Sequence, residues 1–61
     1  MTREAYINKW AHGYLGNWRA LSERDRRRFV QSLRHHIAMS NPGTEKRVSR
    51  LTLQLIEQET A

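Results

Sequence analysis

The sequence contains no cysteine and only one proline among its 61 residues. Without cysteine the chain has no disulfides and no thiolate metal ligands, so helix packing or oligomerisation must stabilise so small a domain. No apolar run approaches the roughly 20 residues that span a bilayer, and the first residues lack the apolar segment of a secretory signal. We therefore expect residues 1–61 to form a single cytoplasmic domain that is not associated with a membrane.

The sequence also lacks the patterns of an enzyme or a metal site. It has no glycine-rich phosphate loop and no nucleophile paired with a base. His35 and His36 are adjacent, whereas metal-binding histidines on one helix are spaced four residues apart. A chain this short leaves little room for a ligand pocket of a few hundred Å³. We expect no catalytic residue, no metal, no cofactor and no small-molecule substrate.

Glycine and proline divide the chain into three segments, each with helical periodicity. The first helix is expected over about residues 3–15, because Gly16 is a suitable residue to end it. Its apolar face recurs at steps of three and four residues and comprises Ile7, Trp10, Ala11, Tyr14 and Trp18. This spacing favours core packing for these aromatic side chains and for Tyr6, with Trp18 in the connection after the helix. Stacking on nucleic-acid bases is the alternative, chiefly for Trp10 or Trp18.

A capping pattern opens the second helix, where Ser22 is followed three residues later by Asp25. We expect this helix over about residues 23–39. Its apolar stripe is about 100° wide and comprises Phe29, Val30, Leu33 and Ile37. Arg26 falls on the same side, and we expect it to snorkel to the edge or to pair with Glu4 or a C-terminal acid.

The third helix is expected over about residues 44–58, after a turn that contains Pro42 and Gly43. Its apolar arc is wider than one neighbouring helix can cover, because Leu53 and Ile56 extend the stripe of Val48, Leu51 and Leu55. We therefore expect Leu53 and Ile56 to form an oligomer interface, most simply that of a homodimer. The expected fold is all-α. It is a three-helix domain in which the second and third helices form a long antiparallel hairpin and the first packs across it.

Positive charge is unevenly distributed along the chain. The net charge is +5, and nine of the eleven basic residues are arginine, whose planar fork suits phosphate and carboxylate. The second helix places its basic residues opposite the apolar stripe, at Arg24, Arg27, Arg28, Arg34 and His35. The first half of the third helix carries Lys46, Arg47 and Arg50. Most of these cations lie where the helix dipole disfavours them, which favours a role in binding.

An antiparallel hairpin would bring the end of the second helix close to the start of the third. The expected result is one combined basic patch of Arg34, His35, His36, Lys46, Arg47 and Arg50. Salt bridges to Glu57 and Glu59, within or between subunits, are the alternative role for these cations.

These features predict a small basic nucleic-acid-binding regulator without catalytic activity, which acts as a homodimer on DNA or RNA. A helix-turn-helix is one version, with Lys46, Arg47, Ser49 and Arg50 on the reading helix. RNA binding by a helical dimer is equally compatible. The alternative is a protein–protein interaction module, such as an adaptor, an inhibitor or a small subunit, whose arginines dock an acidic partner.

Overall fold

The computed structural model describes all 61 residues and contains three helices and no strand. The helices are α1 (Arg3–Ala20), α2 (Glu23–Met39) and α3 (Thr44–Thr60). The predicted all-α class with three helices is therefore confirmed. None of the three combines the length and the apolar character that a bilayer crossing requires.

Local sequence signals explain where the helices begin. The hydroxyl of Thr2 accepts a hydrogen bond from the backbone N–H of Ala5 at 3.1 Å, and the Ser22 hydroxyl accepts one from Asp25 at 3.3 Å. Each bond satisfies one of the free N–H groups in a first helical turn. Helix α3 follows Gly43 and has no side-chain cap. All three starts agree with the sequence prediction.

The predicted end of the first helix is wrong. Helix α1 continues through Gly13 and Gly16 to Ala20, and Trp18 belongs to the helix rather than to the connection. Each glycine costs a helix interior about 1 kcal/mol relative to alanine. Trp18 is only 6% exposed and packs with Leu15 and Ile56. The burial of its side chain outweighs the cost of the two glycines. Tertiary packing therefore sets the length of α1.

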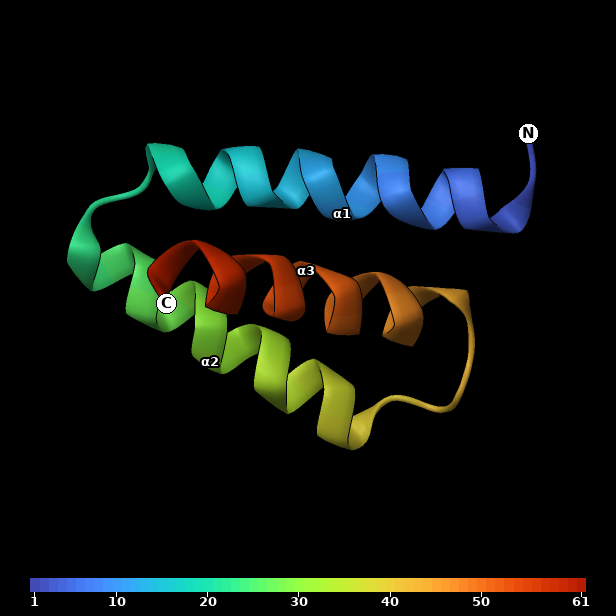
Figure 1. Cartoon of the computed structure of the whole chain (residues 1–61). Coiled ribbons are helices and arrows are strands. Elements are labelled where there is room, and N and C mark those ends of the chain that lie inside the picture. The colour runs from blue at the N-terminus through green and yellow to red at the C-terminus, as the bar shows by residue number, and fades with distance from the viewer.

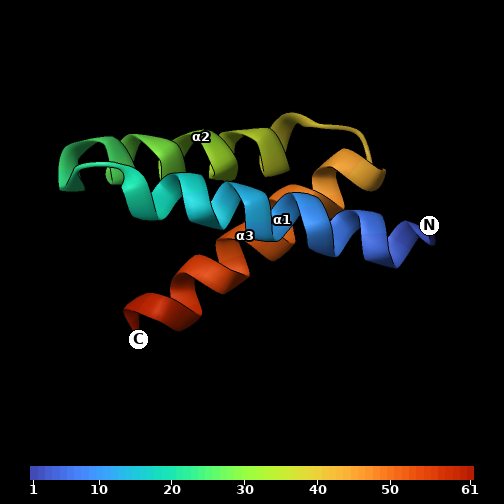
Figure 2. The ribbon, with the colours of Figure 1, turned by 90° about the horizontal axis from the view of Figure 1, so that it is seen from above.

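Helix α3 is the central helix of the fold. It packs against both α1 and α2, whereas α1 and α2 touch each other little. Figures 1 and 2 show α3 turning back from the end of α2 and crossing α1 obliquely. The expected α2–α3 hairpin with α1 across it is not confirmed, because the larger interface of α3 is with α1.

The core forms mainly between α1 and α3. Its buried apolar residues are Ile7, Ala11, Leu15 and Trp18 from α1 and Val48 and Ile56 from α3. Helix α2 has no fully buried residue, and its stripe contributes Phe29, Val30 and Leu33 as half-buried contacts. Helix α2 is therefore peripheral, and the side opposite its apolar stripe faces solvent.

Candidate nucleic-acid interface and an aromatic groove

The outer side of α2 carries a row of exposed basic side chains. We call it the α2 basic face, and it consists of Arg24, Arg27, Arg28, Arg34 and His35. The chain forms two salt bridges, Arg19–Glu59 and Arg47–Glu4, and neither involves α2. From Arg24 to His35 the face covers about 16 Å along the helix axis. The α2 basic face is thus an extended cationic surface whose side chains form no salt bridge within the chain; Glu23 and Glu57 line the same hollow as Arg27 and Arg34.

Arg26 has a different environment from the other arginines of α2. Its Nε donates a hydrogen bond to the Trp18 carbonyl at 3.1 Å, and a terminal nitrogen donates one to the Arg19 carbonyl at 2.6 Å. Its guanidinium carbon lies 4.6 Å from the centroid of the Trp18 ring. Arg26 thus reaches the edge of the core, the first of the two expected roles, and binds carbonyl groups at the end of α1. It forms no salt bridge with Glu4 or a C-terminal acid, although its charge contributes to the lowered pKa of Glu59.

The basic residues of α3 do not continue the α2 basic face. Lys46 is half-buried, with its Nζ 3.5 Å from the Ser40 carbonyl oxygen. Arg47 forms a 3.5 Å salt bridge with Glu4, and Arg47 and Arg50 line a hollow between α1 and α3. Arg34 lines a different hollow, between α2 and α3. The combined basic patch expected from the sequence is therefore divided between two surfaces.

One of the predicted reading residues of α3 faces α2. Ser49 is buried, and its hydroxyl lies 2.8 Å from Nδ1 of His36. Ser49 is therefore not accessible to a groove of DNA. Arg47 and Arg50, which the helix-turn-helix version also places on the reading helix, remain exposed.

The predicted oligomer interface at Leu53 and Ile56 needs correction. Ile56 is only 3% exposed and packs with Leu15 and Trp18 in the core. Leu53 is half-buried. The apolar arc of α3 is wide because α3 packs against two helices of its own chain, so the arc no longer argues for a homodimer.

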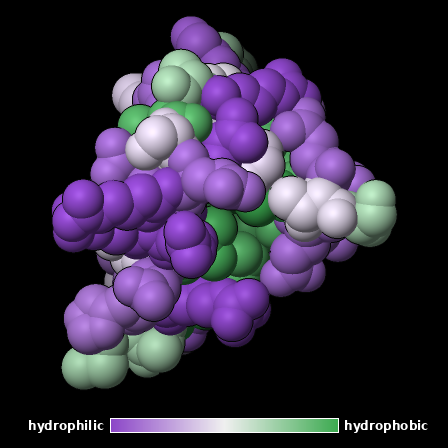
Figure 3. Space-filling model, turned by 90° about the vertical axis from the view of Figure 1, so that its left-hand side faces the viewer, coloured by the Kyte–Doolittle hydropathy of each residue, from purple (hydrophilic) through white to green (hydrophobic).

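The hollow between α2 and α3 has an apolar floor and a charged rim. It is open to solvent, has a volume of about 640 Å³ and includes Val30, Leu53 and Ile56 among its apolar residues. Arg27 and Arg34 line it from the α2 side. Figure 3, a view onto the end of the molecule where α1 turns into α2, shows apolar surface at the bottom of a depression among hydrophilic side chains.

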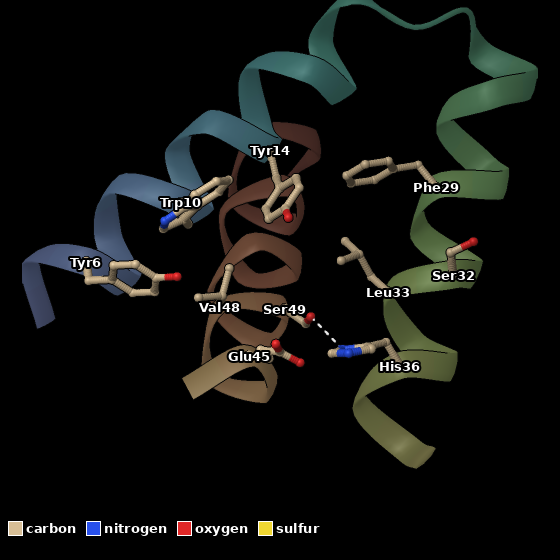
Figure 4. A pocket seen from close by; sticks show the side chains of 10 residues that line it. All are labelled: Tyr6, Trp10, Tyr14, Phe29, Ser32, Leu33, His36, Glu45, Val48 and Ser49. Atoms are coloured by element: carbon tan, nitrogen blue, oxygen red, sulfur yellow. Dashed lines mark hydrogen bonds between the residues drawn. The ribbon is translucent and has the colours of Figure 1, made fainter. Parts of the chain in front are cut away.

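A second groove, between α1 and α2, is lined by aromatic side chains and has a volume of about 480 Å³. Tyr6, Trp10 and Tyr14 remain 44%, 46% and 39% exposed. Their ring centroids follow one another at 6.1 and 6.0 Å along α1. Figure 4 shows these rings on one side and Phe29 and Leu33 on the other, with α3 between them. We call this site the aromatic groove.

The predicted core role is wrong for Tyr6, Trp10 and Tyr14 and correct for Trp18 alone among the aromatic residues of α1. Two apolar rows run side by side along α1. The row that α3 covers begins at Ile7 and includes Ala11 and Leu15. The spacing of both rows is helical, so periodicity could not tell which one is buried.

No group of three histidine or acidic side chains is close enough to hold a metal ion. Comparison of the chain with protein-family models, with curated proteins and with solved structures finds no match.

Proposed function

We propose that the protein binds the phosphate backbone of nucleic acid through the α2 basic face and catalyses no reaction. One observation carries this proposal: the four arginines of the face are exposed on one side of α2 without a carboxylate partner. By contrast, Arg19 and Arg47, on the other two helices, each form a salt bridge. The four arginines of the α2 basic face are therefore free for an external anion.

Arginine suits phosphate because its planar guanidinium donates two parallel hydrogen bonds to the oxygens. A row about 16 Å long meets two or three successive phosphates and releases the counterions held there. Contacts to phosphate orient a protein without reading sequence. The proposal is therefore backbone binding to DNA or RNA that depends little on base sequence, and it does not require a dimer.

Binding to duplex DNA and duplex RNA, measured by fluorescence anisotropy over a salt series, tests this function. If the face contacts two or three phosphates, the logarithm of the association constant should fall with a slope of about 2 to 3 against log salt. Replacement of Arg27, Arg28 and Arg34 by alanine should abolish binding, while the helical circular dichroism is unchanged.

A variant with Arg3, Lys9 and Arg50 replaced by alanine is the matched control, because it removes the same charge from exposed positions outside the face. It should retain most of the binding. Equal losses in the two triple variants would mean that net charge, rather than the α2 basic face, drives binding, and would contradict the proposal.

A further inference from the structure

We propose that the aromatic groove binds an amphipathic helix of a partner protein, one whose apolar stripe is flanked by acidic residues. The groove lies on the α1 side of α2 and shares no residue with the α2 basic face. The inference is therefore independent of nucleic-acid binding. Together the two surfaces would make the protein an adaptor.

The exposed rings are the first argument. Tyr6, Trp10 and Tyr14 form a continuous aromatic wall over successive turns of α1. Tyrosine and tryptophan are the side chains most enriched at energetically dominant positions of protein interfaces, because they bury a large rigid area on binding. Phe29 and Leu33 form the facing wall (Figure 4), so an inserted side chain would contact apolar atoms on both sides.

The polarity of the groove favours apolar side chains over nucleic-acid bases as the occupant. Base edges need hydrogen-bond partners when they leave water. Two of the polar side chains that line the groove, His36 and Ser49, are already bonded to each other at 2.8 Å. Neighbouring rings are tilted by 53° and 37°, so they do not present the parallel faces that stacked bases would need. Apolar side chains that recur every three or four residues along a partner helix need neither hydrogen-bond partners nor parallel ring faces.

The charge of the helices around the groove distinguishes between a second copy of the chain and a different protein as the partner. The walls come from α1 and α2, the two helices with an excess of basic residues, and Glu45 is the one carboxylate that lines the groove. Arg3 precedes the aromatic row by one turn, is exposed and forms no salt bridge. A second copy of the chain would bring these two basic helices against their equivalents. A partner helix with acidic flanks would complement them.

The test uses two synthetic helical peptides with the same leucine stripe, one with glutamate flanks and one with lysine flanks. Proton–nitrogen NMR reports on the site directly, because Trp10 lines the groove and the indole N–H of Trp18 is buried. The glutamate peptide should shift the Trp10 signal. The lysine peptide should bind at least about 10-fold more weakly, the loss expected when like charges meet at the rim.

Substitutions in the aromatic groove test whether the peptide binds there. Trp10→Ala and Tyr14→Ala should each weaken binding of the glutamate peptide by about 30-fold, the loss typical of a dominant interface residue. Met39→Ala is the control, because Met39 is 72% exposed and lies outside the groove. It should bind like the parent. Circular dichroism checks that each variant is folded.

Four outcomes of the peptide and sedimentation experiments would overturn the inference. They are an unchanged Trp10 signal with the glutamate peptide, equal binding of the two peptides, full binding by folded Trp10→Ala, and a dimer in sedimentation that Trp10→Ala dissociates. The last would assign the groove to a second copy. A single-stranded oligonucleotide that displaces the peptide from Trp10 would assign it to bases. None of these outcomes depends on whether the arginines of α2 bind a duplex.

Discussion

The guanidinium of Arg26 stacks over the indole ring of Trp18, with its carbon 4.6 Å from the ring centroid. The same group donates hydrogen bonds to the main-chain carbonyls of Trp18 and Arg19. The last carbonyls of a helix lack their usual partners within it, and the Trp18 carbonyl also accepts the N–H of Leu21 at 3.1 Å. A side chain of α2 thus helps to satisfy the end of α1 and joins two helices that otherwise touch little.

Replacement of Arg26 by alanine should lower the free energy of unfolding by about 1–3 kcal/mol, through loss of the cation–π contact and the carbonyl hydrogen bonds. Urea denaturation followed by circular dichroism measures the change. Arg24→Ala is the control on the same helix, because Arg24 is exposed and unpaired. It should change stability by less than about 0.5 kcal/mol. Equal effects would show that Arg26 does not act through Trp18.

Gly16→Ala should stabilise the protein by about 0.5–1 kcal/mol, because Gly16 lies inside α1 and alanine is the better helix former. A Cβ atom at this position would meet nothing within 4 Å, so no clash opposes the gain. Thermal or urea denaturation measures it. If α1 instead ended at Gly16 in a left-handed cap, the substitution would destabilise the protein. The sign of the change therefore decides between the two helix lengths.

Ile56→Ala should lower the free energy of unfolding of the domain rather than dissociate an oligomer. We expect a loss of about 2–4 kcal/mol, because Ile56 is buried between Leu15 and Trp18. Leu53→Ala should cost less, because Leu53 is half-buried. Urea denaturation gives the stabilities, and sedimentation gives the mass. A folded Ile56→Ala with a smaller mass than the parent would restore the interface role first expected from the sequence.

The salt bridge between Arg19 and Glu59 should make stability depend on pH. The hydrogen bond from Arg19, assisted by its charge, lowers the pKa of Glu59 below its ordinary value of 4.5. A lowered folded-state pKa contributes stability that is fully present above the ordinary value and lost as pH falls through the lowered one. The parent should therefore be more stable than Glu59→Gln at pH 7. The difference should vanish once Glu59 is protonated in the folded state.

Denaturation of both proteins at a series of pH values checks this prediction. High salt should also reduce the difference, because both side chains are partly exposed and their attraction is screened. Glu57→Gln is the control, since Glu57 lies on the same helix and forms no salt bridge. A Glu59→Gln variant as stable as the parent at pH 7 would show that the bridge contributes nothing. A difference that persists in strong acid would assign the effect to something other than charge.

Helix starts, the stripe of α2 and its basic face could be predicted from the sequence because each depends on residues close together in the chain. Ser22 caps α2 through an N–H three residues away. The side of α2 that carries Arg27 and Arg34 follows from the helical repeat once Leu33 faces the core. The all-helical class follows from the same local rules.

The tertiary structure alone decided which row of α1 is buried, how far α1 extends, and why the arc of α3 is wide. All three depend on where α3 lies. By packing on the row of Ala11 and Leu15, α3 leaves Trp10 beside the groove and draws Trp18 into the core. The helical repeat sorts residues onto faces, but it does not say which face meets a neighbour, since burial is a property of two surfaces in contact.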